Sequence, residues 1–501
     1  MEWSLSELPR FGTSSRRQTP SKRRSVERAR AGRPRGRRWF SELLLLFGLL
    51  VVGGRIEADT GAARTPIVDE EPTLIAFDDL DVPVEPAPAL DDQEERRHDD
   101  SESKIRIGLY DPDRKHFVLV RSGDSDPVPF ELTVEMITQL RYSGFARSSQ
   151  TWIDSTGASN TVNNTSVFEI NRNWVEFNGY ALDPKLQFRT IVFTSTASNN
   201  AIFLGYLRYE FDPALRLNGG YWKVPGTREW ANSFSNTLGV DRTMATTFFR
   251  PGFSPGIWVD GDLGSGLNYI AMLANSIRSE AETANRIGTN MVYSAGLEWQ
   301  PWGDFGPGPS DIEDHRDPAA RLGSIVTFTR KVNQGTSEPA NPEDTIIRLS
   351  DGTPLFLFQA LGPGSQLNAA NFLLWTLDAG VKWRGLSVTG EYFLRWLGSF
   401  SYSGAAPERS SLFDHGGYLQ SGVFAIPRTL EGYLRSSTVT GPFGRGYEWS
   451  LGFNWFPREA RSWRVSFDVT RILHSPADNI LTGYRAGESG TLFQAQMLVD
   501  F

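Results

Sequence analysis

The last nine residues of the chain, Phe493 to Phe501, read Phe-Gln-Ala-Gln-Met-Leu-Val-Asp-Phe. In an extended strand, successive side chains point to opposite faces. One face of this stretch is therefore apolar, with Phe493, Ala495, Met497, Val499 and Phe501. A strand with one apolar face that ends on an aromatic residue is typical of the last strand of a bacterial outer-membrane β-barrel. It also fits an amphipathic strand of a soluble sandwich.

The same alternation recurs upstream, between Phe130 and the closing strand. Residues 377–383 and 449–455, for example, place Leu, Ala, Val, Phe or Trp at every second position and charged, polar or small residues between them. Alternation alone does not separate a membrane barrel from a sandwich, because both have one apolar face. The connections between the segments separate the two folds better.

Two kinds of connection alternate along this region. Seven are turns, at 183–184, 212–213, 264–266, 301–318, 384–385, 427–428 and 457–462. Eight are polar stretches of unequal length, at 146–164, 195–200, 225–256, 279–288, 332–369, 398–413, 436–445 and 473–490. Short turns on one rim and long loops on the other are the pattern of outer-membrane barrels, with tryptophans near the strand ends. We therefore predict an all-β, transmembrane antiparallel β-barrel of about 16 strands over residues 130–501.

Three further segments precede the predicted barrel. Residues 1–58 combine a long basic region with the ten-residue apolar core Leu43–Val52, which predicts a signal peptide; a membrane anchor is the alternative. Residues 59–104 are acidic and contain prolines, which predicts a disordered linker. Residues 105–129 hold two short apolar runs around Asp111-Pro112-Asp113, which predicts a small periplasmic hairpin.

The composition limits the classes of function. There is no cysteine, so no disulfide or thiolate metal site is expected. Thirteen basic and five acidic residues give residues 1–58 a net charge of +8, so the rest of the chain carries −16 of the total of −8. An acidic mature chain argues against nucleic-acid binding.

Several stretches resemble the phosphate-selective porin O and P family of diderm bacteria. They are Gly220–Glu229 (Gly-Tyr-Trp-Lys-Val-Pro-Gly-Thr-Arg-Glu), Asp241-Arg242, Pro255–Asp262, Gly417–Arg435 and the closing strand. The resemblance covers residues 130–501. It implies a sixteen-stranded, usually trimeric, passive porin of the outer membrane that favours anions and needs no cofactor. It also implies outer-membrane lipid and the barrel-assembly machinery as partners, with Phe501 as the assembly signal.

A porin selects solutes by its width and by charged side chains near its constriction. The third long loop, 225–256, is the expected constriction, and its candidate anion-binding residues are Lys223, Arg228, Arg242 and Arg250. Six further arginines are expected to line the lumen: Arg189, Arg208, Arg216, Arg395, Arg435 and Arg464. The alternative is that they pair with acids on neighbouring strands, from the set Glu131, Glu135, Glu210, Glu391, Glu431 and Asp468.

No catalytic motif accompanies this pattern, so we do not expect an enzyme. The five histidines form no metal-binding or protease motif, and the acidic cluster Asp311–Asp317 is expected to be a solvated turn and not a metal site. Two alternatives to a porin stay open. One is a non-conducting outer-membrane barrel for adhesion or envelope anchoring, with residues 59–104 as a tether. The other is a soluble, secreted β-protein that binds glycans.

Overall fold

The computed structural model describes residues 106–111, 116–123, 126–198, 200–277, 290–335 and 342–501. The predicted signal peptide, 1–58, and the predicted linker, 59–104, lie outside the described residues. No helix among the described residues is long and apolar enough to cross a membrane.

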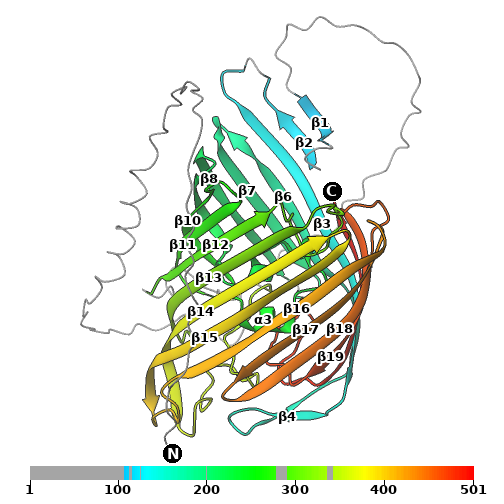
Figure 1. The fold of residues 1–501 in the computed structure, drawn as a ribbon. Coiled ribbons are helices and arrows are strands. Elements are labelled where there is room, and N and C mark those ends of the chain that lie inside the picture. Colours follow the sequence, from blue (N-terminus) through cyan, green and yellow to red (C-terminus); the bar gives the residue numbers. More distant parts are fainter. Residues whose placement is uncertain (1–105, 112–115, 124–125, 199, 278–289, 336–341) are drawn as a thin grey trace, which may run out of the picture. The chain divides into compact units, whose positions relative to one another are not determined.

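The predicted sixteen-stranded antiparallel barrel is confirmed (Figure 1). Each barrel strand pairs antiparallel with its neighbours, and the last pairs with the first: Gly490 lies opposite Arg147 and Asp500 opposite Ile137. The strands are β3 (Phe130–Arg147), β6 (Thr165–Ala181), β7 (Asp183–Ser195), β8 (Asn200–Asp212), β9 (Leu215–Lys223), β10 (Phe253–Asp262), β11 (Leu267–Ala274), β12 (Val292–Trp302), β13 (Ala319–Val332), β14 (Ser365–Trp383), β15 (Leu386–Gly404), β16 (Leu412–Ile426), β17 (Leu430–Gly441), β18 (Gly444–Trp455), β19 (Trp463–Leu473) and β20 (Gly490–Asp500).

The outward face of the barrel is apolar, and the alternation of the strands explains why. Trp449 and Leu451 of β18 are each 64% exposed, whereas Ser450 between them is 3% exposed. On the closing strand, Phe493 and Met497 point outward, and Gln494 and Gln496 are buried on the inner face, as predicted. An outward band of large apolar side chains belongs in lipid, because water would not tolerate so large an apolar patch.

One predicted loop is largely strand. Residues 436–445 were expected to be a polar loop, but β17 runs to Gly441 and β18 starts at Gly444, so the connection is a two-residue turn. The expectation was wrong because Ser436, Thr438 and Thr440 are polar residues on the outward face of β17, and composition alone does not distinguish a polar strand end from a loop.

Two small hairpins stand outside the ring. β4 (Thr151–Ile153) and β5 (Ser159–Thr161) pair with each other in the first long loop. β1 (Arg106–Asp111) and β2 (His116–Arg121) pair in the segment predicted to form a hairpin. β2 also pairs with β3, with Arg121 opposite Glu131 and Phe117 opposite Val134. Because β20 ends opposite Ile137, the hairpin extends the sheet beside β3 just beyond the closing strand.

Candidate functional site

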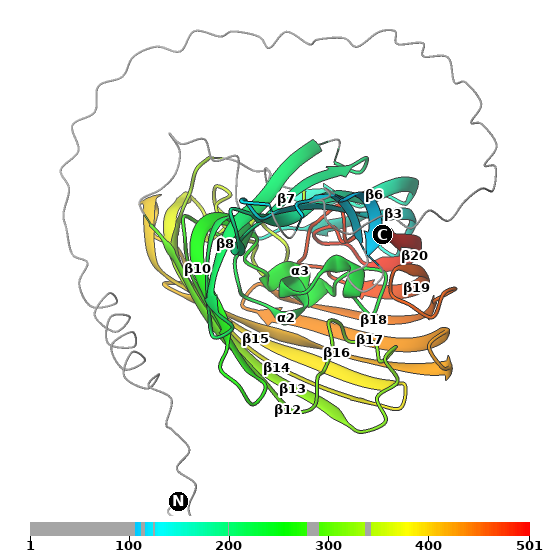
Figure 2. The same cartoon turned by 90° about the horizontal axis from the view of Figure 1, so that it is seen from above.

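The third long loop, called L3 here (residues 224–252), lies inside the barrel (Figure 2). It contains the short helices α2 (Arg228–Ala231) and α3 (Met244–Phe249) and the 3-10 turn η2 (Phe234–Asn236). Threonines cap both α-helices: the Thr227 hydroxyl accepts from Trp230 N and the Thr243 hydroxyl from Thr246 N. All six residues of α3 are buried, so L3 has a core of its own within the lumen.

Acidic side chains of the barrel wall accept hydrogen bonds from the backbone of L3. Glu391 of β15 accepts from Arg228 N at 2.7 Å, and Asp468 of β19 from Val240 N at 3.2 Å. Glu448 of β18 accepts from Met244 N at 2.9 Å. A buried irregular loop needs partners for its amide groups, and here the wall carboxylates supply them.

Donors of the wall bind the carbonyl oxygens of L3 in the same way. The wall side chains come from seven strands, β12 to β14 and β17 to β20: Ser294 and Thr327 donate to Pro225 O, Thr376 to Gly226 O, Arg464 to Thr237 O, Asn454 to Leu238 O, Gln496 to Val240 O and Arg435 to Asp241 O. The loop is therefore attached to the wall along most of its length. The charged inner faces of these strands hold a folded loop in place.

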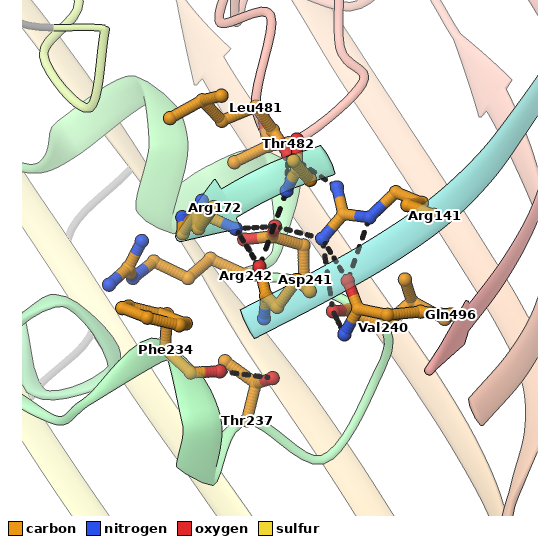
Figure 3. A network of polar contacts seen from close by, with 12 residues as sticks. Arg141, Arg172, Phe234, Thr237, Val240, Asp241, Arg242, Leu481, Thr482 and Gln496 are labelled. Atoms are coloured by element: carbon orange, nitrogen blue, oxygen red, sulfur yellow. Dashed lines mark hydrogen bonds and ion pairs between the residues drawn. The ribbon is translucent and has the colours of Figure 1, made fainter. Parts of the chain in front are cut away.

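A buried ionic cluster fixes the middle of L3 (Figure 3). The carboxylate of Asp241 lies 2.6 Å from Nη2 of Arg141 on β3 and 2.6 Å from Nη1 of Arg172 on β6. Arg172 also pairs with Glu343, which belongs to the fifth long loop, called L5 here (residues 333–364). Glu343 in turn lies 3.0 Å from Arg242. Two loops and two strands thus meet in one network of alternating charges.

The cluster shifts the pKa values of its loop carboxylates. Burial by itself would raise the pKa of Asp241, but the guanidinium groups of Arg172 and Arg141 outweigh it and hold that pKa far below its ordinary range. The same balance, with Arg172 and Arg242 as the main cations, lowers the pKa of Glu343 to about 2. Both acids therefore stay charged at every physiological pH.

Trp230 of α2 is fully buried beside this cluster and is surrounded by cations. Lys223 Nζ lies 5.1 Å from the ring centroid, and the guanidinium carbons of Arg242 and Arg250 lie at 4.8 and 4.6 Å. The negative face of an indole attracts cations, and more strongly where water is excluded. Trp230 is thus the common neighbour of three of the four residues predicted for the constriction.

The eighth long loop, called L8 here (residues 474–489), also enters the lumen. The carbonyl oxygen of Leu481 accepts from Arg141 and from Asn171, and Tyr484 donates to Glu448. Apolar side chains of L3, L5 and L8 pack into one buried cluster that includes Phe248, Leu355 and Tyr484. On the side of the barrel formed by β14 to β20, the described loops pack against the inside of the wall.

The predicted constriction residues fall into two environments. Lys223, Arg242 and Arg250 are buried, at 8%, 1% and 0% exposure, and Lys223 Nζ donates to Asn232 O. Arg228 has a side chain that is 12% exposed, and it pairs with Glu298 at 2.6 Å and with Asp378 at 3.2 Å. Of the four, Arg228 lies nearest to open space.

The six predicted lumen arginines all project inward, but mostly onto partners other than the expected acids. Arg435 lies 4.0 Å from Asp468, a partner named from the sequence. The other pairs are Arg189 with Glu176, Arg395 with Asp414, and both Arg208 and Arg216 with Asp260, while Arg464 binds a carbonyl of L3. Arg189, Arg208 and Arg216 are a quarter to a third exposed, whereas Arg395, Arg435 and Arg464 are buried under L3 and L5.

Two cavities of about 350 Å³ each lie inside the opposite side of the wall. The first, called the β8–β13 cavity here, lies beneath L3 and is lined by charged residues and by a set of apolar ones: Trp222, Val224, Pro225, Trp258, Ile270 and Ile325. The second lies against β3, β6 and β7 and includes Glu131, Glu135 and Arg189. Open space in the described lumen therefore concentrates on the side of β6 to β12.

The segment between β12 and β13, residues 303–318, is a folded part of the short-turn rim. Asp311 accepts from Gly385 N at 2.8 Å, and Glu313 accepts both a bidentate pair from Arg461 and a contact from Lys382. Ligand atoms of Asp311, Glu313 and His315 lie within 4.8 Å of one another. Since these carboxylates already serve neighbouring turns, we interpret the group as the scaffold of the rim, in line with the expectation of a turn.

Three residues are central to the site, and the sequence did not single out the first two of them: Arg141, Arg172 and Glu343. The first two occupy inner-face positions of their strands, so alternation could have placed them in the lumen. Glu343 lies in a loop, and no local pattern links it to residues 93 to 171 positions away.

Comparison with known proteins gives structural neighbours but no relatives by sequence. No family model matches the chain, and no curated protein matches it. The resemblance to the phosphate-selective porin family therefore stays a prediction. The structure is similar to the outer membrane channel DcaP of Acinetobacter baumannii, with 9% identity, a TM-score of 0.43, and coverage of 74% of this chain and 97% of that one.

Two further neighbours show a similar degree of likeness. An anion-selective porin from Comamonas acidovorans has 13% identity, a TM-score of 0.42, and coverage of 74% of this chain and all of that one. The trimer form of the outer membrane protein OmpT of Vibrio cholerae has 12% identity, a TM-score of 0.42, and coverage of 74% and 99%. At such low TM-scores these likenesses carry no conclusion about function. What the chain itself establishes is a closed sixteen-stranded barrel with an apolar exterior and a lumen partly filled by its own loops.

Proposed function

We propose that this chain is an outer-membrane porin that carries small hydrophilic solutes by passive diffusion through a narrow passage. The observation that carries the proposal is the combination of an apolar outer wall with polar cavities on the side of the lumen that L3 leaves open. A water-filled passage beside a fixed inner loop limits solutes by size and charge. The expected solutes are small anions, because Arg208, Arg216 and Arg228 line that passage.

We further propose that the short-turn rim faces the periplasm and the long-loop rim faces outward. In this orientation the hairpin β1–β2 and the end of β20 are periplasmic. Phe501 would then be presented to the barrel-assembly machinery, and three copies of the chain would associate in the membrane. The trimer and the assembly signal are supported by the family resemblance of the sequence.

Single-channel recording in planar bilayers tests the proposal. Purified full-length chain should produce stepwise currents, and a reversal potential measured in asymmetric KCl should indicate anion preference. The Arg228→Ala variant should shift the reversal potential toward cation preference, because Glu298 loses its partner in the passage. A matched control is Arg471→Ala on the outer face, which should change nothing.

A non-conducting barrel for adhesion or envelope anchoring is the second candidate. It is favoured by one observation: L3 is attached to wall strands from β12 to β20 and to β3, and the described loops pack against the inside of that wall. A protein that inserts, shows heat-modifiable migration on gels and yet stays electrically silent would support this candidate and refute the porin.

A further inference from the structure

The β8–β13 cavity contains a cationic fork that the protein leaves open. Nε of Arg216 donates to Oδ1 of Asp260 at 2.6 Å. Among the described residues, its two Nη groups donate no hydrogen bond. The side chain is 26% exposed, and it lines the cavity. A guanidinium edge with two parallel donors matches a carboxylate, which it can bind with two hydrogen bonds.

The wall beside this fork carries more positive than negative charge. Arg208 and Arg216 share one acid, Asp260, at 3.4 and 2.6 Å. Arg208 uses Nε for the amide oxygen of Asn218, so that Asn218 and Asp260 hold both arginines in place. Glu210 lies opposite Arg216 across β8 and β9, but it is neither ion-paired with Arg216 nor part of the cavity lining, so the lining itself has two arginines to one acid here.

The opposite side of the cavity does not cancel that excess. Arg228 faces Glu298 at 2.6 Å and Asp378 at 3.2 Å, and Arg321 shares Asp378 at 3.5 Å. Two arginines and two acids balance there. Lys223 also lines the cavity, but its side chain is buried and donates to Asn232 O, so it is left out of this balance. The cavity as a whole therefore favours an anion.

The remainder of the lining is apolar. L3 contributes Val224 and Pro225, and the wall contributes Trp222, Ile270 and Ile325. The volume of about 350 Å³ lies in the range of small-molecule pockets. An inorganic phosphate would leave most of this space empty and most of its oxygens without donors. An anion with one carboxylate and an apolar body would satisfy both halves of the cavity.

We propose that the β8–β13 cavity is a binding site for small organic monocarboxylates with a flat or apolar body, which bind Arg216 through their carboxylate. The proposal deepens the porin function and rests on it for its physiological meaning. We expect monocarboxylates of this kind to stay longer in the passage than other small solutes. The site lies near the short turn at Asp212–Leu215. In the proposed orientation, a solute moving toward the periplasm would reach this site just before it left the barrel at the short-turn rim.

Binding is measured on the detergent-solubilised, full-length chain, independently of conduction. In saturation-transfer difference NMR, benzoate should bind saturably, whereas benzyl alcohol, which has the same body without the charge, should bind about tenfold more weakly. Inorganic phosphate should displace benzoate only at about tenfold higher concentration than unlabelled benzoate analogues require. Equal binding of benzoate and benzyl alcohol, or displacement by phosphate as effective as by an analogue, would overturn the proposal.

Two variants that change the charge in opposite directions sharpen the test. Arg216→Gln should weaken benzoate binding about tenfold, the factor expected for lost charge-assisted hydrogen bonds. Asp260→Asn should strengthen binding, because it increases the positive excess while keeping the shape of the side chain. Arg471→Gln, on the outer face, is the control and should bind as the parent does. A barrel in which the first two variants change affinity in the same direction, or not at all, contradicts the proposal.

The two proposals fail in different ways. Saturable benzoate binding by an electrically silent protein would refute the porin and leave the site standing. Stepwise anion currents without saturable benzoate binding would refute the site and leave the porin standing. Each variant is first tested for heat-modifiable migration on gels, which shows that its barrel has folded. Only folded variants are then compared in the binding and conductance measurements.

Discussion

Replacing Asp241 by Asn tests whether the buried cluster holds L3 inside the barrel. The substitution keeps the size of the side chain and removes the charge that Arg141 and Arg172 share at 2.6 Å each. Asp241 is 2% exposed, so water cannot take over its role. Loss of one partner from a buried ion pair costs about 3–5 kcal/mol, because the remaining charges stay buried without compensation.

That free energy acts on the seating of the loop, since the sixteen-stranded ladder is hydrogen-bonded without Asp241. Each ~1.4 kcal/mol corresponds to a factor of ten in population. The fraction of molecules with L3 displaced should therefore rise about 100- to 4,000-fold. Displacement exposes Arg242, which is 1% exposed in the parent and is a site for trypsin because Thr243 follows it.

The assay is limited trypsin digestion of the folded protein in detergent, followed by mass spectrometry of the fragments. Cleavage after Arg242 should accelerate in Asp241→Asn, because cleavage follows the population of the open form when reclosing is fast. Channel conductance should rise in parallel. Asp260→Asn is the matched control, since Asp260 also pairs with two arginines but does not contact L3. If both variants were digested like the parent, the cluster would not be what retains the loop.

Three further predictions concern other parts of the fold. Burial raises the pKa of Glu488 in L8 from its ordinary 4.5 to about 7, so its contribution to seating L8 is fully present below pH 4.5 and is lost as pH rises through 7. The effect on the free energy of seating L8 is at most about 3 kcal/mol. L8 should therefore be digested faster above pH 7, and Glu488→Gln should abolish this pH dependence. A digestion rate that still depends on pH after the substitution would contradict the prediction. Trp230→Ala should raise conductance and lower the free energy of unfolding by about 3–5 kcal/mol. Trp230→Phe should retain most of the parent's stability and a conductance close to that of the parent. Equal effects of the two substitutions would show that the aromatic ring does not hold L3 in place. Deletion of Phe501 removes the two hydrogen bonds that its backbone exchanges with Met136, at 2.7 and 3.1 Å, and should reduce the yield of heat-modifiable barrel without changing the conductance of the molecules that assemble; normal yield would argue against an assembly signal.

The sequence was sufficient to predict the barrel because alternation is a local property. Every inner or outer position of the closing strand follows from its neighbours two residues away, and the structure places Gln494 and Phe493 on the expected faces. The number of strands followed from the contrast between turns and loops. It survived the misassigned loop at 436–445, because a two-residue turn joins strands as a longer loop would.

The roles of the charged inner residues could not be predicted in this way. Alternation places Arg435 and Arg464 in the lumen, but it does not say whether water, an acid or a loop meets them there. The carbonyl oxygens that they bind belong to L3, 194 and 227 residues away in the sequence. Only the folded position of L3 decides that question, and L3 itself has no periodic pattern from which its path could be inferred.

The attachment of L3 has a consequence for the order of events during assembly. Its partners include Asp468 and Gln496, which follow L3 by 228 and 256 residues. Those contacts cannot form until the final strands have been made and brought beside β3, and contacts between such distant residues form slowly. Seating of the loop is therefore a late step, coupled to closure of the ring. A loop that resists protease would mark a finished molecule, and a cell could distinguish complete barrels from incomplete ones by that property alone.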